Sequence, residues 1–287
     1  MKTFETFKNK YPRQKMTINR NDFYYRYYKN EKSNKTIVLL TGGIGLSDLL
    51  LLHFEAFAKS YSVLSFDYHI AYTTNQELVD AIAELLKMLK VKVFLVGQSL
   101  GGFIAQILAQ QYPELIEGLI LSNTGTLSVD MDEKGAQSLY YMIKRLDKSI
   151  FLIKFMPFGL VKKSIKRAVM KKTNSRLSEQ EQIIMSEICD EMVRTLTRDY
   201  EIHMILLLKD LQNHWNMKES DFINYKNKVL LILSDDDFTF NDNVKQALTN
   251  IMPSPKVITD IRGGHIALLL KLDKYVQSVV DFINSLE

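Results

Sequence analysis

The stretch VFLVGQSLGGFIAQ, residues 93–106, is an apolar run interrupted by a single serine that lies between glycines. Gly97, Ser99 and Gly101 form the pattern G-x-S-x-G, which is typical of a serine nucleophile at a sharp turn between a buried strand and a helix. Glycines two positions before and after the serine avoid collisions with the neighbouring strand and helix. The free N–H groups at the start of the helix favour negative charge beside the serine. The pattern therefore indicates a nucleophile, although a glycine-rich turn without chemistry would have the same spacing.

Short apolar runs elsewhere in the chain, together with the run before Ser99, indicate the strands of a sheet. Continuous apolar runs suit strands that are buried on both faces, as in a parallel sheet. These runs lie at residues 35–41, 61–67, 91–97, 117–123 and 228–234.

A hairpin and several helices are expected around these strands. Tyrosines and β-branched residues flank a turn signal in residues 15–28, which predicts a hairpin. Thr74 and Glu77 have the spacing of a capping box that opens a helix. Helical periodicity also occurs over residues 99–112 and 243–252. Strands that alternate with helices predict a doubly wound α/β fold.

The alternation of strands and helices is interrupted in the middle of the chain. The simplest organisation is an α/β core of residues 1–124 and 219–287 with a helical insertion over residues 125–218. Within the insertion, Ser178 and Glu181 have the spacing of a further capping box. Eight of the twelve methionines lie in the insertion, where they would suit a plastic cap over an apolar pocket. For most of them we favour the ordinary core of a helical layer, and we expect a minority to face the pocket.

His265 and Asp237 are the expected base and acid for the serine. A serine hydroxyl needs a base, and the order along chains with this motif is serine, acid, histidine. His265 follows two glycines and the last apolar run of the chain. The usual spacing after the preceding strand is a small residue, two variable residues and the acid, which points from Ser234 to Asp237. Asp235 and Asp236 are competing choices, and their alternative role is that of solvated turn residues.

Two backbone N–H groups are expected to bind the oxyanion of a tetrahedral intermediate. One belongs to Leu100, directly after the serine, and the other to Gly43 in the loop TGGIG of residues 41–45. Random placement would not gather eight of the twelve glycines at three strand ends, where α/β sheets bind ligands. These glycines are Gly42, Gly43, Gly45, Gly97, Gly101, Gly102, Gly263 and Gly264.

In these features the sequence resembles the α/β-hydrolase superfamily over roughly residues 15–124 and 220–287. The resemblance implies a mostly parallel, eight-stranded sheet and a Ser99–Asp237–His265 triad. It also implies that the insertion is a cap or lid domain.

The sequence departs from the usual pattern of that superfamily in three places. Thr41 stands where many members have histidine, and Asn123 occupies an alternative position for the acid. The segment at residues 66–76 lacks the usual G-x-G-x-S loop. That shortening, together with GQSLGG, is similar to the maspardin branch, some of whose members are thought not to be enzymes.

Composition and net charge limit the classes of partner, the cofactors and the cellular location that we expect. The 287 residues have a net charge of +4 and no nucleic-acid-binding motif, so we expect no nucleic-acid partner. The single cysteine, Cys189, excludes a Cys-based metal site, and no metal or organic cofactor is implied. The charged N-terminal segment is unlike a signal peptide, so a cytoplasmic location is expected. The oligomeric state is left open.

Residues 151–176 contain eight cations and no anion. A basic amphipathic stretch can contact an anionic membrane or attract an acidic substrate. We expect a solvated helix face here rather than a membrane contact, because single amphipathic patches bind weakly.

The sequence predicts a serine hydrolase that cleaves an ester of a small to medium apolar substrate through an acyl-enzyme. A thioester or an amide is a further option for the bond that is cleaved. The alternatives are a non-catalytic binding protein on the same fold, and a peptidase or C–C bond hydrolase with the same triad. Fold alone does not decide between them.

Overall fold

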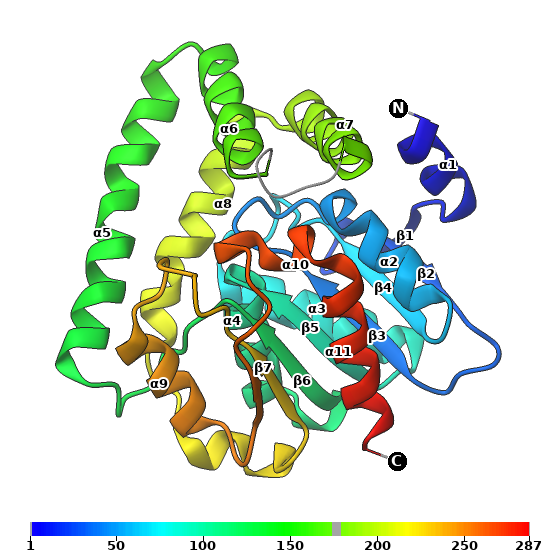
Figure 1. Cartoon of the computed structure of the whole chain (residues 1–287), viewed down its shortest axis with the longest axis vertical. Helices are drawn as coiled ribbons and strands as arrows, with labels where there is room; N and C mark the ends of the chain where they lie inside the picture. Colours follow the sequence, from blue (N-terminus) through cyan, green and yellow to red (C-terminus); the bar gives the residue numbers. More distant parts are fainter. Residues whose placement is uncertain (1, 174–178, 287) are drawn as a thin grey trace.

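The computed structural model describes residues 2–173 and 179–286, which form one eight-stranded sheet flanked by helices (Figure 1). The strand order is β1-β2-β4-β3-β5-β6-β7-β8. β2 pairs antiparallel with β1 and with β4, and every other neighbouring pair is parallel. The strands are β1 (Gln14–Ile18), β2 (Asn21–Tyr28), β3 (Thr36–Leu40), β4 (Ser62–Phe66), β5 (Val93–Gln98), β6 (Ile116–Ser122), β7 (Val229–Ile232) and β8 (Lys256–Ile258).

The five apolar runs of the sequence form the central strands β3 to β7, and the predicted hairpin is formed by β1 and β2. Asn19 and Arg20 link β1 to β2 with φ angles of 49° and 66°. Positive φ at both central residues is what a two-residue turn of the I′ type requires. The mostly parallel sheet and the α/β fold class are therefore confirmed.

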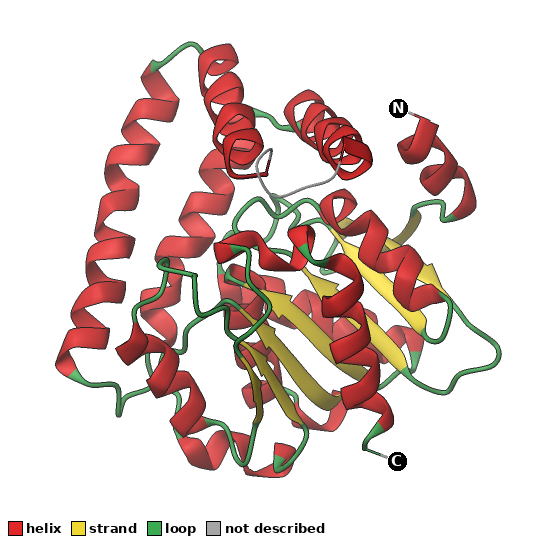
Figure 2. Ribbon diagram, in the orientation of Figure 1, coloured by secondary structure: helices red, strands yellow, loops and turns green. Residues whose placement is uncertain are grey.

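Helices cover both faces of the sheet (Figure 2). They are α1 (Lys2–Lys10), α2 (Leu51–Ala58), α3 (Asn75–Leu89), α4 (Leu100–Gln111), α5 (Glu133–Phe155), α6 (Phe158–Thr173), α7 (Glu179–Thr195), α8 (Arg198–Asp210), α9 (Asp242–Ile251), α10 (Ala267–Leu270) and α11 (Leu272–Asn284).

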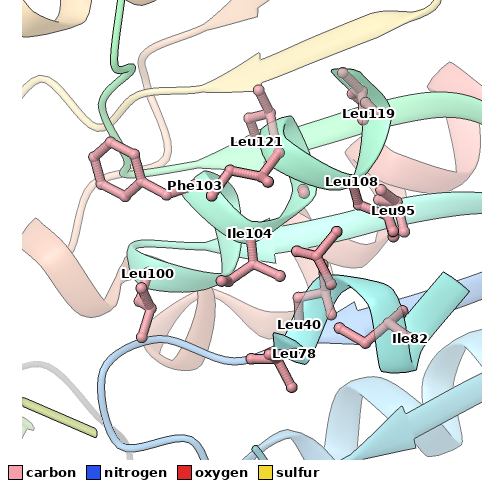
Figure 3. Close-up of a cluster of buried hydrophobic side chains, with 14 of the residues drawn as sticks. Leu40, Leu78, Ile82, Leu95, Leu100, Phe103, Ile104, Leu108, Leu119 and Leu121 are labelled. Atoms are coloured by element: carbon pink, nitrogen blue, oxygen red, sulfur yellow. The ribbon is translucent and has the colours of Figure 1, made fainter. Parts of the chain in front are cut away.

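Alternate residues of the strands fill two separate apolar cores. In β3, Val38 and Leu40 face the core beneath α3 and α4, whereas Ile37 and Leu39 face the core beneath α1, α2 and α11. The core on the α3–α4 side appears in Figure 3, where the helices and strands pack through leucine, isoleucine and phenylalanine side chains. Burial on both faces is the physical reason why these strands are continuously apolar.

Within the described residues, the four α-helices α5 to α8 lie between β6 and β7 along the chain, and the bounds of the insertion, residues 125–218, stay a prediction. Asn75, at the start of α3, links α8 to the core. Its side-chain amide donates a hydrogen bond to the carbonyl oxygen of Leu207 in α8, at 3.0 Å. The backbone N–H of Asn75 also donates to Asp210, at 2.7 Å. Ser178, the first residue of the second expected capping box, lies outside the described residues.

The first capping box differs in one detail from its expected form. Thr74 caps α3 by accepting a hydrogen bond from the N–H of Glu77 at 3.2 Å. The Glu77 carboxylate returns to the N–H of Thr73, at 2.7 Å, rather than to that of Thr74. The predicted start of the helix is therefore confirmed. The second hydrogen bond of the capping box, made by the Glu77 carboxylate, goes to the residue before the expected one.

Thr74→Ala should lower the free energy of unfolding by about 1 kcal/mol, because one N–H group of the first turn of α3 loses its acceptor. Thr73→Ala is the matched control and should cost less, since its backbone N–H still reaches Glu77. Urea unfolding of the three proteins measures both effects. An equal decrease in the free energy of unfolding of the two variants would show that the side chain of Thr74 stabilises α3 no more than that of Thr73.

Candidate active site

Ser99 lies on a strained turn between β5 and α4. Its φ and ψ angles are 54° and −118°, a backbone conformation that residues other than glycine rarely adopt. A Cβ atom on Gly97 would lie 2.4 Å from the carbonyl oxygen of Gly101. A Cβ atom on Gly101 would lie 2.2 Å from the carbonyl oxygen of Leu40. Only glycine fits at both positions, as the sequence motif requires.

The structure brings together Ser99, His265 and Asp237, although they are far apart in sequence. The Nε2 atom of His265 lies 2.9 Å from the Oγ atom of Ser99. Its Nδ1 atom lies 2.9 Å from the Oδ2 atom of Asp237. With Nδ1 protonated toward Asp237, the free Nε2 atom is oriented to accept the serine proton.

Asp237 is ionised in this arrangement. Burial of Asp237 works to raise the pKa of its carboxyl, but hydrogen bonding and charge attraction from His265 and the N–H of Thr239 outweigh burial and lower the pKa. The side chain is buried, with an exposed fraction of 2%. A buried carboxylate with this partner suits the orientation of an imidazole.

Asp235 and Asp236 lie in a turn after β7 and contact the loop that carries His265. The carboxylate of Asp236 accepts hydrogen bonds from the N–H groups of Gly263 and Gly264, at 3.1 and 2.9 Å. Asp235 pairs with Arg262 at 2.6 Å on the exposed side of the same loop. Neither aspartate hydrogen-bonds to the imidazole, whose Nδ1 atom pairs with the third aspartate of the run. This geometry favours Asp237 over both competing choices.

Two polar residues at strand ends also support the loop, and sequence analysis did not assign them this role. Asn123, which follows β6, donates to the carbonyl oxygen of Gly264 at 2.9 Å and accepts from the N–H of Ser234 at 2.8 Å. Gln98, at the end of β5, donates to the carbonyl oxygen of His265 at 3.0 Å. A polar residue at the end of a buried apolar strand is the sequence signal that could have identified them.

Both expected oxyanion donors lie beside the serine. Leu100 is the first residue of α4, so its N–H has no acceptor within the helix. Gly43 lies in the wall of the cavity that contains Ser99. These positions are compatible with the expected oxyanion site, which stays a prediction.

The cavity at Ser99 is small and mostly apolar. It has a volume of about 190 Å³. Its wall is formed by Thr41, Gly42, Gly43, Ile44, Leu49, Leu50, Gln98, Ser99, His265, Ile266, Leu268 and Leu269. Among the described residues, none in this wall belongs to α5–α8. The expectation that some methionines of the insertion face the pocket is therefore wrong for this cavity.

Most of those methionines pack inside the helical layer or against the core instead. Met185 and Cys189 of α7 form a small buried cluster with Leu270, against which Met170 of α6 and Ile266 pack. Methionine fills such irregular contacts well because its side chain is unbranched and flexible. The helical layer therefore supports the cavity from behind its wall.

Comparisons with known proteins concern the fold of the chain rather than the geometry of the site. Residues 64–155 match the family model described as alpha/beta hydrolase fold. A hydrolase structure from Pseudomonas aeruginosa is 15% identical with a TM-score of 0.71, over 95% of this chain and 98% of that chain. The enol-lactonase from Burkholderia xenovorans is 18% identical with a TM-score of 0.70, over 94% and 100% of the two chains.

A thermophilic esterase from Thermogutta terrifontis, in its malate-bound structure, is 14% identical with a TM-score of 0.65, over 95% and 98% of the two chains. No curated protein matches the sequence significantly. Residues 64–155 thus resemble the α/β-hydrolase family model, and the solved structures share their fold with nearly the whole chain. At these identities the solved structures establish the shared fold and leave the substrate open.

Asparagine substitutions should separate the three aspartates. Asp237→Asn should lower kcat by about 10⁴-fold, because the amide no longer holds the required tautomer of His265. Asp236→Asn should lower kcat far less, and Asp235→Asn least of all, because these residues contact the loop rather than the imidazole. Parallel kinetics on one p-nitrophenyl ester measure the series. A larger loss at Asp236 than at Asp237 would move the assignment of the acid by one residue.

Proposed function

We propose that this protein is a serine hydrolase that cleaves a carboxylic ester with a short apolar acyl group through an acyl-enzyme. The observation that carries the proposal is the continuous chain of hydrogen bonds from Ser99 through His265 to the Asp237 carboxylate. A neutral serine hydroxyl is a weak nucleophile, and an adjacent imidazole with an oriented tautomer is the usual means of activating it.

The first half of the reaction forms the acyl-enzyme. The Oγ atom of Ser99 attacks the ester carbonyl carbon while the Nε2 atom of His265 takes the hydroxyl proton. Asp237 stabilises the imidazolium, and the N–H groups of Leu100 and Gly43 bind the oxyanion. Each such donor contributes about 2.7–4 kcal/mol to lowering the barrier. His265 then protonates the departing alcohol, and the C–O bond of the ester breaks.

The second half of the reaction is the same sequence with water as the nucleophile. His265 takes a proton from water, and the resulting hydroxide attacks the acyl-enzyme. When the second tetrahedral intermediate collapses, His265 returns the proton to Ser99 and the carboxylic acid leaves. The imidazole of His265 thus carries every proton in both halves of the reaction, and the proposed reaction needs no cofactor.

The cavity supports a short apolar acyl group as the substrate class. Its volume of about 190 Å³ is smaller than the roughly 300–1,000 Å³ of pockets for drug-sized ligands. Leucine and isoleucine form much of its wall, so methylene groups would be desolvated there. The structural neighbours that are named an esterase and an enol-lactonase support an ester, in its open or cyclic form, at the level of substrate class.

Labelling with a fluorophosphonate probe tests whether the serine is activated. Wild type should be labelled, and Ser99→Ala should lose both labelling and ester hydrolysis without unfolding, because the residue is the proposed nucleophile. Ser278→Ala is the matched control, since this partly exposed serine on α11 donates to the carbonyl oxygen of Lys274 and lies outside the wall of the cavity. Absence of labelling in wild type would favour the non-catalytic binding protein. Turnover by Ser99→Ala would show that the nucleophile is another group.

The dependence on acyl length tests the cavity. From p-nitrophenyl acetate upward, each buried methylene should raise kcat/KM by at most about fourfold, which corresponds to about 0.8 kcal/mol. The rise should stop at butyrate or hexanoate, where the cavity is full. Leu269→Ala should move the best substrate to a longer acyl chain, because Leu269 lies in the wall.

Leu206→Ala is the control for this series, because Leu206 is exposed on α8 and outside the wall. It should leave the best acyl length unchanged. A preference for acetate over all longer esters, or an unchanged optimum in Leu269→Ala, would place the acyl group in a different pocket.

A further inference from the structure

Large apolar side chains are concentrated on the surface where α5 turns into α6. Phe151, Leu152, Phe155, Met156 and Leu160 are all exposed, and Phe155 is 73% exposed. These five side chains, termed the α5–α6 patch, are five of the sixteen large apolar side chains that are exposed among the described residues. Contiguous exposed apolar surface of this kind marks a contact site in proteins that otherwise bury such groups.

Cations surround the patch, and acidic residues are missing from its stretch of sequence. Residues 148–173 contain no aspartate or glutamate. Lys148, Lys154 and Lys163 are exposed around the patch. None of these three lysines pairs with a carboxylate within residues 2–173 and 179–286. The surface therefore combines free positive charge with apolar side chains.

The patch is held in place by the neighbouring helix. Arg198, at the start of α8, donates to the carbonyl oxygens of Lys154 and Met156. The rings of Phe151 and Phe155 lie against each other, with centroids 4.7 Å apart. Figure 1 shows the turn at the upper edge of the molecule, away from the sheet. The turn can therefore reach a flat surface without rearrangement of the core.

We propose that the α5–α6 patch docks on an anionic lipid surface. Phenylalanine and leucine side chains at the end of a helical hairpin can enter the boundary between headgroups and acyl chains, while lysines meet the lipid phosphates. Docking of this kind lies on the membrane surface, because no helix in the described part of the chain is long and apolar enough to cross a bilayer. The sequence alone favoured a solvated face, and the exposure of the five apolar side chains changes that preference.

Charge argues for lipid over a second copy of the chain. In a symmetric dimer the same patch would face itself, which would bring the lysines of both copies together, and residues 148–173 of neither copy supply a carboxylate to pair with them. An anionic lipid surface supplies negative charge and apolar depth at one place. Lipid is therefore the occupant that complements both properties of the patch.

Docking would also place α6, a helix that packs on the cluster behind the cavity wall, next to the lipid surface. Met170 of this helix packs on the buried cluster of Met185, Cys189 and Leu270, directly behind the cavity wall. The helix that carries part of the patch is thus in apolar contact with the segment that follows His265. A lipid-docked molecule would keep this end of the protein near the surface.

Flotation with vesicles tests the proposal. The full-length protein should float with vesicles of phosphatidylcholine and phosphatidylglycerol, but not with vesicles of phosphatidylcholine alone. High salt should weaken the binding, because the lysine contribution is screened. Phe151→Ser/Phe155→Ser should lose binding at every salt concentration, and Lys154→Glu/Lys163→Glu should lose the preference for phosphatidylglycerol.

Ile223→Ser and Lys226→Glu are the matched controls. Ile223 is 63% exposed on the short helix Glu219–Tyr225, and Lys226 is exposed beside it, so both changes leave the α5–α6 patch intact. Circular dichroism and hydrolysis of a water-soluble ester should show that all variants are folded. These readouts keep the lipid proposal separate from the proposed hydrolase activity.

Three results would overturn the proposal. The first is absence of wild type from the floating phosphatidylglycerol vesicles. The second is equal flotation of wild type and Phe151→Ser/Phe155→Ser. The third is a wild-type dimer in light scattering that becomes a monomer in the same double variant, which would make the patch an interface between copies of this chain.

Discussion

The close approach of Gly101 to the carbonyl oxygen of Leu40 is the contact on which the site depends. A side chain at this position would lie 2.2 Å from that oxygen, so α4 could not begin where it does. Without this start of the helix, Ser99 would not be held at a φ of 54° with its hydroxyl facing His265. The strain of one residue is maintained by packing that involves no catalytic side chain.

The second requirement of the site is a fixed loop for His265, and polar residues at the strand ends provide it. Asn123 and Ser234 bridge the ends of β6 and β7, and the hydroxyl of Ser234 donates to the carbonyl oxygen of Ile261 at 2.7 Å. Asp236 binds the two glycine N–H groups directly before the histidine. Buried polar groups are costly when unpaired, so these bonds favour one position of the loop. The imidazole thereby meets Ser99 and Asp237 at the same time.

The strands and the position of the serine could be predicted because their signals are local. A continuous apolar run buries both faces of a strand, and two glycines around Ser99 report a steric conflict within a few residues. His265 and Asp237 were predicted from the order of elements along the chain together with local spacing, which left Asp235 and Asp236 as competing choices for the acid. The position of Gln98 and Asn123 at strand ends could have marked them as candidates, but their partners could not be predicted, because these become neighbours only when separate strand ends meet.

The helix at the N-terminus, α1, was likewise not predicted from the sequence, because its packing depends on contacts that form only in the folded chain. Four of the nine residues of α1 are charged, yet Phe4 and Phe7 are buried, and the ring of Phe7 packs against Phe54 of α2. Two apolar positions in nine residues are too weak a pattern to predict a docked helix. The face that α1 covers depends on the core cluster beneath α2, which forms only in the folded chain.

Composition alone likewise did not distinguish the two surfaces of the helical insertion. Its methionines suggested an inner surface toward substrate. Apart from the exposed Met156, however, the described ones that belong to the apolar clusters pack within the helical layer or against the core, and the core supplies the cavity wall. Its aromatic residues at the α5–α6 turn are the ones that stay exposed. Apolar side chains are left in water on the outer face while the inner face packs without lining the cavity. The physical division is therefore between a core that forms the site and an insertion whose apolar character is directed outward.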